Sequence, residues 1–414
     1  MTSTRLTIQR LGAQGDGIAD TPRGPVFVPF ALPGETVTAA LNQDRADLIA
    51  VLDPSRSRVK PTCRHFGTCG GCSLQHLEEG AYRAFKRETV VTALRQRGLD
   101  VEVAELVACP TASRRRVTWT ALRTEAGVLL GYRKAMSHDV VDISEDPIAV
   151  PAIESAIRLV RELAGVVATG GDAFRLLVTA TETGLDIAVS GTGPLAAGRR
   201  QRASQFAIAN RLARLSVEGE IVVEPNKPQV IVGDVVVNPP PGAFLQAVAE
   251  AEAAMAGLVM GHLAKAKRVA DLFTGIGTFA LRLAKNSMVH AVEGEGEALQ
   301  ALDRAFRHGQ GLKTITNERR DLYRRPLTWK ELSAFDGLVF DPPRAGAEDQ
   351  ARQIARSEVR YVAAVSCNPA TLARDLSILV EGGYRLLSVT PIDQFLWSHH
   401  VEAVALLEKP KKRR

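Results

Sequence analysis

The stretch RVADLFTGIGTF, residues 268–279, joins a short apolar run to a loop that carries two glycines. The apolar run predicts a buried strand, and the glycines allow the backbone to approach a ligand closely where the chain turns into a helix. The glycine spacing differs from the GxGxxG pattern of dinucleotide-binding turns. This stretch therefore indicates the first strand of an α/β domain whose ligand lies at the strand's carboxyl end.

Three further apolar runs follow at residues 288–293, 337–341 and 361–366, each succeeded by a polar or glycine-containing turn and a helical segment. This alternation from about residue 243 predicts a doubly wound α/β sheet. The second run ends in Glu293, where a carboxylate can accept hydrogen bonds from ribose hydroxyls. Together these features fit an adenosyl ligand without a pyrophosphate, S-adenosylmethionine. NAD or another nucleotide is the alternative.

Polar motifs at the strand ends supply candidate reactive groups. The sequence DPPR, residues 341–344, is an acidic residue followed by a rigid, extended turn. The sequence SCNP, residues 366–369, places Cys367 where a thiolate could act as a nucleophile, although a lone free cysteine is more often a packing residue. Near the end of the chain, Glu402 opens an apolar run, and taken alone it is more typical of a surface carboxylate at a strand end.

The rest of the chain divides into two further units. Residues 1–58 contain alternating apolar segments broken by glycines, which is typical of a small all-β module. Residues 59–235 begin with the cysteine cluster and a helix expected at about 82–97, and from about residue 100 the pattern is largely strand-like, with helices expected at about 151–164 and 204–214. The prolines at 239–241 mark a break, so we expect domains at 1–58, 59–235 and 236–414.

Three of the five cysteines lie in CRHFGTCGGC, residues 63–72. Taken alone, Cys63, Cys69 and Cys72 suggest a structural zinc site completed by His65 or His76. An odd number of cysteines does not suit a disulfide scaffold, which favours a reducing, cytoplasmic setting.

The composition is ordinary and mildly basic. The 414 residues carry a formal net charge of +6, which permits a polyanionic partner. No apolar run is long enough to span a bilayer, and the N-terminus has no secretory signal pattern. We therefore expect no membrane association and no obligate protein partner, and a monomer.

The glycine loop, DPPR, SCNPATLARDL (366–376) and HVE (400–402) together resemble the RNA uracil-C5 methyltransferase family, which makes 5-methyluridine. The resemblance covers almost the whole chain, and GDGIA (15–19) with VPFALPGE (28–35) resembles a TRAM RNA-binding domain. It implies a Rossmann-like class I methyltransferase domain. A TRAM/OB-like β-barrel and a mixed, mostly β central domain would precede it.

The resemblance also implies roles for individual residues. Cys367 would add to C6 of uracil, C5 would receive the methyl group, and Glu402 would remove the C5 proton. The target base must leave its stack for this chemistry. Asp341 and Arg344 are expected to organise the site. The S-adenosylmethionine pocket would be lined by Gln246, Phe273, Thr278, Glu293, Asp321 and Asp341. The chain departs from the family at Val248 and Thr278, where Asn is frequent, and at Leu396, where Pro is common.

For the cysteines, the resemblance replaces zinc by a [4Fe-4S] cluster. The family's fourth cysteine follows a Tyr-Arg block, and here Asp146 stands in that context. Cys109 is the only spare thiol, but it precedes the block, so both candidates stay open. A structural or RNA-positioning role is expected, because the methyl transfer needs no electron transfer.

Several alternatives accompany this interpretation. The RNA could be 23S ribosomal RNA or the T-loop of tRNA, and bacterial relatives with the cysteine cluster favour 23S rRNA. A non-catalytic RNA-binding protein would share the same fold and charge. A radical-SAM protein is disfavoured because the cysteine spacing is C-x5-C-x2-C in place of C-x3-C-x2-C.

Overall fold

A seven-stranded sheet forms the C-terminal part of the chain in the computed structural model, which describes residues 3–410. Its strands are β15 (Arg268–Leu272), β16 (Met288–Glu293), β17 (Ile315–Arg319), β18 (Gly337–Phe340), β19 (Tyr361–Ser366), β20 (Arg385–Ile392) and β21 (Glu402–Glu408). The order across the sheet is β17-β16-β15-β18-β19-β21-β20, and only β21 runs antiparallel to its neighbours. The predicted doubly wound α/β sheet is therefore present.

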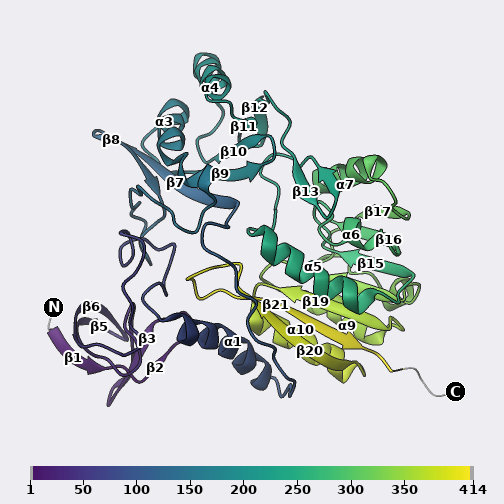
Figure 1. Cartoon of the computed structure of the whole chain (residues 1–414), viewed down its shortest axis with the longest axis horizontal. Helices are drawn as coiled ribbons and strands as arrows, with labels where there is room; N and C mark the ends of the chain where they lie inside the picture. Colours follow the sequence, from purple (N-terminus) through teal and green to yellow (C-terminus); the bar gives the residue numbers. More distant parts are fainter. Residues whose placement is uncertain (1–2, 411–414) are drawn as a thin grey trace.

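Helices cover both faces of this sheet, as Figure 1 shows. They are α5 (Ala249–Leu263), α6 (Ala280–Leu283), α7 (Gly296–His308), α8 (Trp329–Leu332), α9 (Glu348–Arg356) and α10 (Pro369–Glu381). Val269 packs with α5 and α7, whereas Ala270 and Leu272 pack with α9 and α10. From Val269 to Leu272 the first strand of this part is buried on both faces, and three of these four residues are apolar.

The chain order reverses between β15 and β18, which lie side by side at the centre of the sheet. Ligands of such sheets bind in the crevice at the carboxyl ends of these strands. Gly277 allows the loop after β15 to pack closely on α7, since a Cβ there would lie 2.5 Å from the Leu302 Cδ1 atom. Its φ of +100° also disfavours other residues.

The helix predicted at 82–97 is α1 (Glu79–Arg95), which begins at Glu78, whose carboxylate accepts hydrogen bonds from the Gly80 and Ala81 amides. Instead of packing within the central region, α1 lies against α10 and β20. Val90 and Leu94 join the hydrophobic core of the C-terminal sheet. The division into three domains remains a prediction, and α1 shows that the packing crosses one of its boundaries.

The N-terminal module is a six-stranded sheet with the order β1-β5-β6-β4-β3-β2. Its strands are β1 (Ser3–Thr7), β2 (Arg10–Leu11), β3 (Gly17–Thr21), β4 (Gly24–Val28), β5 (Thr36–Asn42) and β6 (Arg45–Asp53). The buried Glu35 carboxylate binds the Arg58 guanidinium, with 2.8 Å between Oε2 and Nη2. This ion pair fixes the chain where it leaves the module.

The central region is a second six-stranded sheet with the order β12-β11-β10-β9-β7-β8. It comprises β7 (Arg116–Thr124), β8 (Gly127–Gly131), β9 (Phe174–Thr181), β10 (Gly184–Ser190), β11 (Arg214–Val217) and β12 (Glu220–Val223). The helices α2 (Pro151–Glu154), α3 (Ile157–Val167) and α4 (Ala197–Ala209) accompany it, and the hairpin of β13 (Val230–Val232) and β14 (Val235–Val237) follows.

The helix predicted at 204–214 begins earlier and ends earlier, as α4. Arg211 has a left-handed φ of +55°, which ends the helical path. Arg214 is then drawn into β11 because its guanidinium pairs with the buried Asp186 carboxylate at 2.6 Å. A long-range ion pair thus overrides the local helical pattern.

The connection between β20 and β21 leaves the C-terminal sheet and reaches toward the N-terminal and central regions (Figure 1). We call residues 393–401 the catalytic loop, because they lead into Glu402, which the sequence predicts to be a catalytic residue. Within residues 3–410, no helix is both long enough and apolar enough to cross a membrane.

Candidate active site

Buried side chains of α1 hold the catalytic loop in place. The Lys86 ammonium is fully buried and lies 2.8 Å from the Asp393 Oδ1 atom, and it also donates to the carbonyls of Phe395 and His400. The Tyr82 hydroxyl donates to the Asp393 Oδ2 atom at 2.5 Å. Burial lowers the pKa of Lys86, and the charge of Asp393 opposes that shift. The loop is therefore fixed by a charged pair that has no access to water.

The tip of the catalytic loop is tied to the cysteine segment. The Ser73 and Leu74 amides, directly after Cys72, donate to the Trp397 carbonyl at 2.8 and 2.9 Å. The Trp397 amide donates to the Tyr82 hydroxyl at 2.8 Å. Trp397 has a left-handed φ of +58°, a backbone conformation that these three bonds hold in place.

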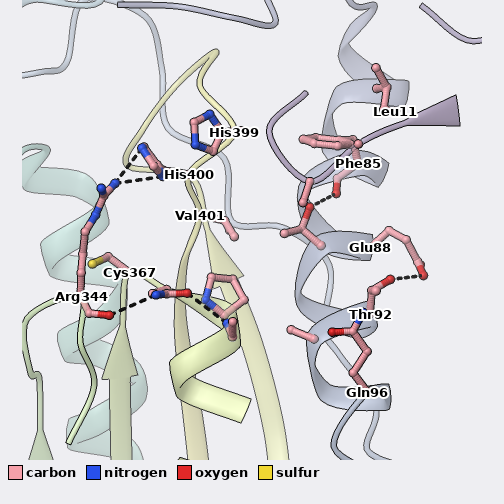
Figure 2. Close-up of a pocket in the computed structure, with 17 residues that line it drawn as sticks. Leu11, Phe85, Glu88, Thr92, Gln96, Arg344, Cys367, His399, His400 and Val401 are labelled. Carbon is pink, nitrogen blue, oxygen red and sulfur yellow. Dashed lines mark hydrogen bonds between the residues drawn. The ribbon is translucent and has the colours of Figure 1, made fainter. Parts of the chain in front are cut away.

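Cys367 follows β19 at the start of α10, whose first turn is capped by the Asn368 side chain. The Asn368 amide group also donates to the Arg344 carbonyl at 3.0 Å, which joins the DPPR and SCNP turns. The half-buried thiol lines a cavity of about 480 Å³. Figure 2 shows Cys367 and Arg344 on one side of this cavity. The α1 side chains Phe85, Glu88, Thr92 and Gln96 lie on the other.

Arg344 points toward the catalytic loop from the DPPR turn. Its Nη2 atom lies 2.7 Å from the His400 Nε2 atom (Figure 2). Burial, together with the charges of Glu402 and Asp341, raises the pKa of the Cys367 thiol to about 11, and Arg344 opposes the shift. The thiol is therefore protonated at neutral pH in the protein alone.

Glu402 opens β21 and is 2% exposed. Burial raises the pKa of its carboxyl, and the charge of Asp341 adds to the shift. The Gln394 amide Nε2 atom donates to Glu402 Oε2 at 2.6 Å and to Gln246 Oε1 at 2.8 Å. Gln246 in turn donates to the Asp341 Oδ2 atom at 3.0 Å. Three predicted residues, Gln246, Asp341 and Glu402, thus join one buried chain through Gln394, which the sequence did not indicate.

The remaining residues expected to bind the cofactor lie along the carboxyl edge of the sheet. The Phe273 ring follows β15 and contacts the Tyr323 ring, with 5.6 Å between centroids. Thr278 is half-buried in the glycine loop. The Asp321 Oδ1 atom, beyond β17, accepts from the Tyr323 amide at 3.0 Å.

Glu293, at the end of β16, already accepts hydrogen bonds from three backbone amides. Its Oε2 atom lies 3.0 Å from the Gly275 nitrogen, and its Oε1 atom accepts from Gly294 and Glu295 at 2.6 and 3.0 Å. A carboxylate oxygen offers two lone-pair sites, so Oε1 is fully used and Oε2 keeps one for a further donor. The carboxylate therefore orders the glycine loop while keeping capacity for one ribose hydroxyl.

The glycine loop fits an adenosyl ligand. Gly275 has a φ of +57°, and a Cβ added there would meet no atom within 4 Å, so the backbone borders open space. The Oδ1 atom of the buried Asp271 has no hydrogen-bond partner. Burial raises the pKa of Asp271 to about 7. An open backbone, an aromatic ring and the free lone pair of Glu293 Oε2 are groups that suit an adenosyl moiety.

The cysteine segment forms a separate small cavity. Cys63, Cys69, Cys72 and Asp146 all line it. The Asp146 Oδ2 atom accepts hydrogen bonds from the Tyr132 hydroxyl at 2.8 Å and from the Trp119 indole at 3.3 Å. Burial, together with the charge of Asp146, raises the pKa of Cys69 to about 11 and that of Cys72 to about 12.

Other candidate ligands of this cavity differ in position. Cys109 lies in the hydrophobic core around α5, close to Lys86 and Asp393, and does not line the cavity. His65 lines it, and its Nε2 atom lies 2.9 Å from the Ser144 amide. His76 instead packs among Phe30 and Phe66. In the described part of the chain, no three His, Cys, Asp or Glu side chains converge to hold a single metal ion.

Comparisons with known proteins give consistent results. A family model for tRNA (uracil-5-)-methyltransferases matches residues 310–410, and a TRAM domain model matches residues 3–47. The chain is 59% identical over 412 residues to an RNA methyltransferase of Mesorhizobium japonicum, with 100% of both chains covered. It is 34% identical to the 23S rRNA (uracil(1939)-C(5))-methyltransferase RlmD of Halomonas elongata, covering 99% of this chain and 90% of that protein.

A solved structure agrees with the fold over nearly the whole chain. The tRNA (uracil-54, C5)-methyltransferase of Pyrococcus abyssi, solved with S-adenosyl-L-homocysteine, aligns with a TM-score of 0.75. The alignment covers 98% of this chain and 100% of that one at 23% sequence identity. The likeness extends from the N-terminal module to the C-terminal sheet, so the arrangement of the three regions is a shared fold.

Proposed function

The chain belongs to the RNA uracil-C5 methyltransferase family, and from this premise we propose that it methylates a uridine of 23S ribosomal RNA through a covalent adduct at Cys367. The observation that carries the mechanism is the placement of a half-buried thiol in a large cavity beside a buried carboxyl group. Glu402 lies close enough for its charge to raise the pKa of Cys367. A nucleophile and a base can thus act on the same six-membered ring.

In the proposed reaction, the Cys367 sulfur forms a bond to C6, and the displaced electron pair moves through C5 and C4 onto O4. S-adenosylmethionine, held by Gln246, Phe273, Glu293 and Asp341, would supply the methyl group that C5 receives. Glu402 then takes the C5 proton, the C5–C6 double bond re-forms, and the S–C6 bond breaks to return the thiolate. In this scheme Cys367 adds to C6 and later leaves it, and Glu402 removes the proton from C5.

Because the pKa of Cys367 is raised, its thiol is protonated before the substrates bind. It must therefore lose its proton once RNA and the methyl donor occupy the site. Arg344 is the protein cation that favours the thiolate. The positive sulfonium charge of the methyl donor would counter the carboxyls of Asp341 and Glu402 in the same way. The non-catalytic alternative loses its support, because the family is one of enzymes and both reactive groups are present.

The choice of 23S rRNA rests on the full-length relative from Halomonas elongata. The three-region architecture does not by itself distinguish the substrates, since an archaeal tRNA enzyme shares the fold over 98% of this chain. Mapping 5-methyluridine by mass spectrometry in rRNA and tRNA from a strain lacking the gene provides the test. Loss from 23S rRNA alone is expected, whereas loss from tRNA alone would overturn the choice. A cytoplasmic location follows from a ribosomal substrate and belongs to the same proposal.

We further propose that the cysteine cavity holds a [4Fe-4S] cluster with Asp146 as the fourth ligand. Each iron of a cluster takes its own ligand, so the three thiols need not converge on one point. Tyr132 and Trp119 both donate to Oδ2 of Asp146, which leaves Oδ1 for iron. Cys109 lies in another part of the core. A hard carboxylate ligand makes one iron more labile than thiolate ligation does.

Iron and sulfide content and visible absorption of anaerobically purified protein test this proposal. We expect Asp146→Ala to lose iron fastest in air, Asp146→Cys to retain it longest, and Cys109→Ala to match the wild type. Absence of iron and sulfide from anaerobically purified and reconstituted protein would contradict the cluster. Iron loss in Cys109→Ala together with retention in Asp146→Ala would contradict the ligand assignment.

A further inference from the structure

We propose that Gln394 is a positioning residue that aims the Glu402 carboxylate at the C5 proton and couples it to the cofactor side of the site. The inference rests on the proposed function and adds a residue that neither the motifs nor the relatives indicate. Gln394 lies in the catalytic loop, is 3% exposed, and has every polar atom of its side chain within reach of a buried partner.

The orientation of the Gln394 amide is fixed by the backbone. Its Oε1 atom accepts from the Ala247 amide at 3.2 Å, and a backbone N–H can only donate. The Nε2 group must therefore face the other way, where its two hydrogens meet Glu402 Oε2 and Gln246 Oε1. A flipped amide would place an oxygen against two acceptors, so a single arrangement satisfies all three contacts.

Gln246 extends this set of hydrogen bonds toward the expected cofactor pocket. Gln246 accepts from Gln394 through Oε1 and donates through Nε2 to Asp341 Oδ2. The chain Ala247–Gln394–Gln246–Asp341 therefore has one direction of donation. Movement of Gln246 would reach Glu402 through two hydrogen bonds, and movement of Asp341 would reach it through three. The base is thus set in position by the residues expected to hold the methyl donor.

The contact also selects which oxygen of Glu402 reacts. Oε2 is occupied by Gln394 at 2.6 Å, which leaves Oε1 to accept the C5 proton. A donor to a carboxylate favours its charged form, and the charged form is the one that acts as a base. Without Gln394, the carboxyl would be harder to ionise and free to rotate. Thiol addition at Cys367 does not use this contact.

The test compares Gln394→Met, which keeps the length but removes both polar groups, with wild-type protein on the same RNA. Adduct formation and adduct resolution are timed separately on denaturing gels over a pH series. We expect Gln394→Met to form the adduct within about threefold of the wild-type rate. It should resolve the adduct at least about tenfold more slowly at neutral pH, with the deficit shrinking as pH rises. Equal resolution rates and equal pH profiles would overturn the inference.

Two further variants complete the design. Gln394→Glu retains an acceptor for Ala247 and can donate to Glu402 only when protonated. Its resolution rate should therefore fall as pH rises, opposite to Gln394→Met. The same trend in both variants would contradict the positioning role. Gln353→Met, a matched change in α9 where the side chain accepts from the Trp329 amide, should behave as wild type. If wild-type protein forms no adduct, the proposed function itself fails, which separates the two results.

Discussion

Individual residues of the site face opposing demands. In the proposed mechanism Cys367 and Glu402 must both be charged to act, yet burial disfavours charge on each of them. The charge of Asp341 raises the pKa of both groups, and the charge of Glu402 raises that of Cys367. In this proposal the protein alone holds a protonated thiol, and binding of RNA and the methyl donor is the event that ionises it.

This arrangement predicts the pH dependence of thiol reactivity. Because the pKa of Cys367 is raised to about 11, the thiolate fraction should keep increasing from neutral to strongly alkaline pH. Iodoacetamide labelling of the Cys367 peptide, followed by mass spectrometry in the absence of RNA, measures it. Arg344→Met should move the profile to still higher pH, since Arg344 favours the thiolate. A labelling rate that levels off below pH 8 would contradict the prediction.

The sequence indicated some of these residues and not others, for a physical reason. Cys367 and Glu402 stand in short motifs at strand ends, where local pattern and position coincide. Gln394 contacts Glu402 directly, and its place in the site also depends on Gln246, which is 148 positions away in the chain. A contact of that kind has no local signature, so only the folded structure could show it.

Among the elements, α1 has a role that its sequence position does not suggest. It follows the cysteine segment, yet it packs on the C-terminal sheet and supports the catalytic loop through Lys86. The Ser73 and Leu74 amides bind the same loop at the Trp397 carbonyl. The catalytic loop is therefore shaped by segments that lie more than three hundred positions earlier.

Removing the Lys86 charge should loosen this loop. In Lys86→Met the Asp393 carboxylate stays 1% exposed without its cation, a loss that costs about 3–5 kcal/mol in comparable buried pairs. Hydrogen exchange of residues 393–401 should rise and methylation should fall. The exposed Lys60→Met carries the same charge change and should alter neither. Unchanged exchange in the Lys86 variant would show that the loop does not depend on α1.

Helices and strands could be predicted from the sequence where a continuous run of residues is buried. The strands of the C-terminal sheet are buried on both faces, so their apolar runs fall near the observed bounds. The helix expected at 204–214 is present but shifted to Ala197–Ala209, and Arg214 lies instead in β11, where it pairs with Asp186, 28 positions away. Charge pairing of this kind competes with helical propensity and is not visible in a local window.

At the scale of the whole molecule, one buried carboxylate joins the central and C-terminal regions. Glu252 near the start of α5 is 1% exposed and binds two guanidinium groups. Its Oε2 atom lies 2.6 Å from Arg115, just before β7, and its Oε1 atom lies 2.7 Å from Arg282 in α6. The relative placement of the two sheets thus depends on a three-charge cluster.

Glu252→Ala should lower the free energy of unfolding by about 3–5 kcal/mol, because two largely buried cations lose their shared partner. Urea denaturation monitored by tryptophan fluorescence measures the change. Glu250→Ala, an exposed position two residues earlier on the same helix, should change stability by no more than about 0.5 kcal/mol. Equal effects of the two substitutions would exclude the buried cluster as the source of stability.

The most direct measurement of the central claim is the trapping of the covalent adduct. RNA with 5-fluorouridine at the target position offers C5 no proton for Glu402 to remove, so the adduct cannot be resolved. With S-adenosylmethionine present, wild-type protein and Cys109→Ala should form a stable RNA–protein complex attached at Cys367, and Cys367→Ala should form none. A complex of undiminished yield in Cys367→Ala, or attachment at another residue, would contradict the account.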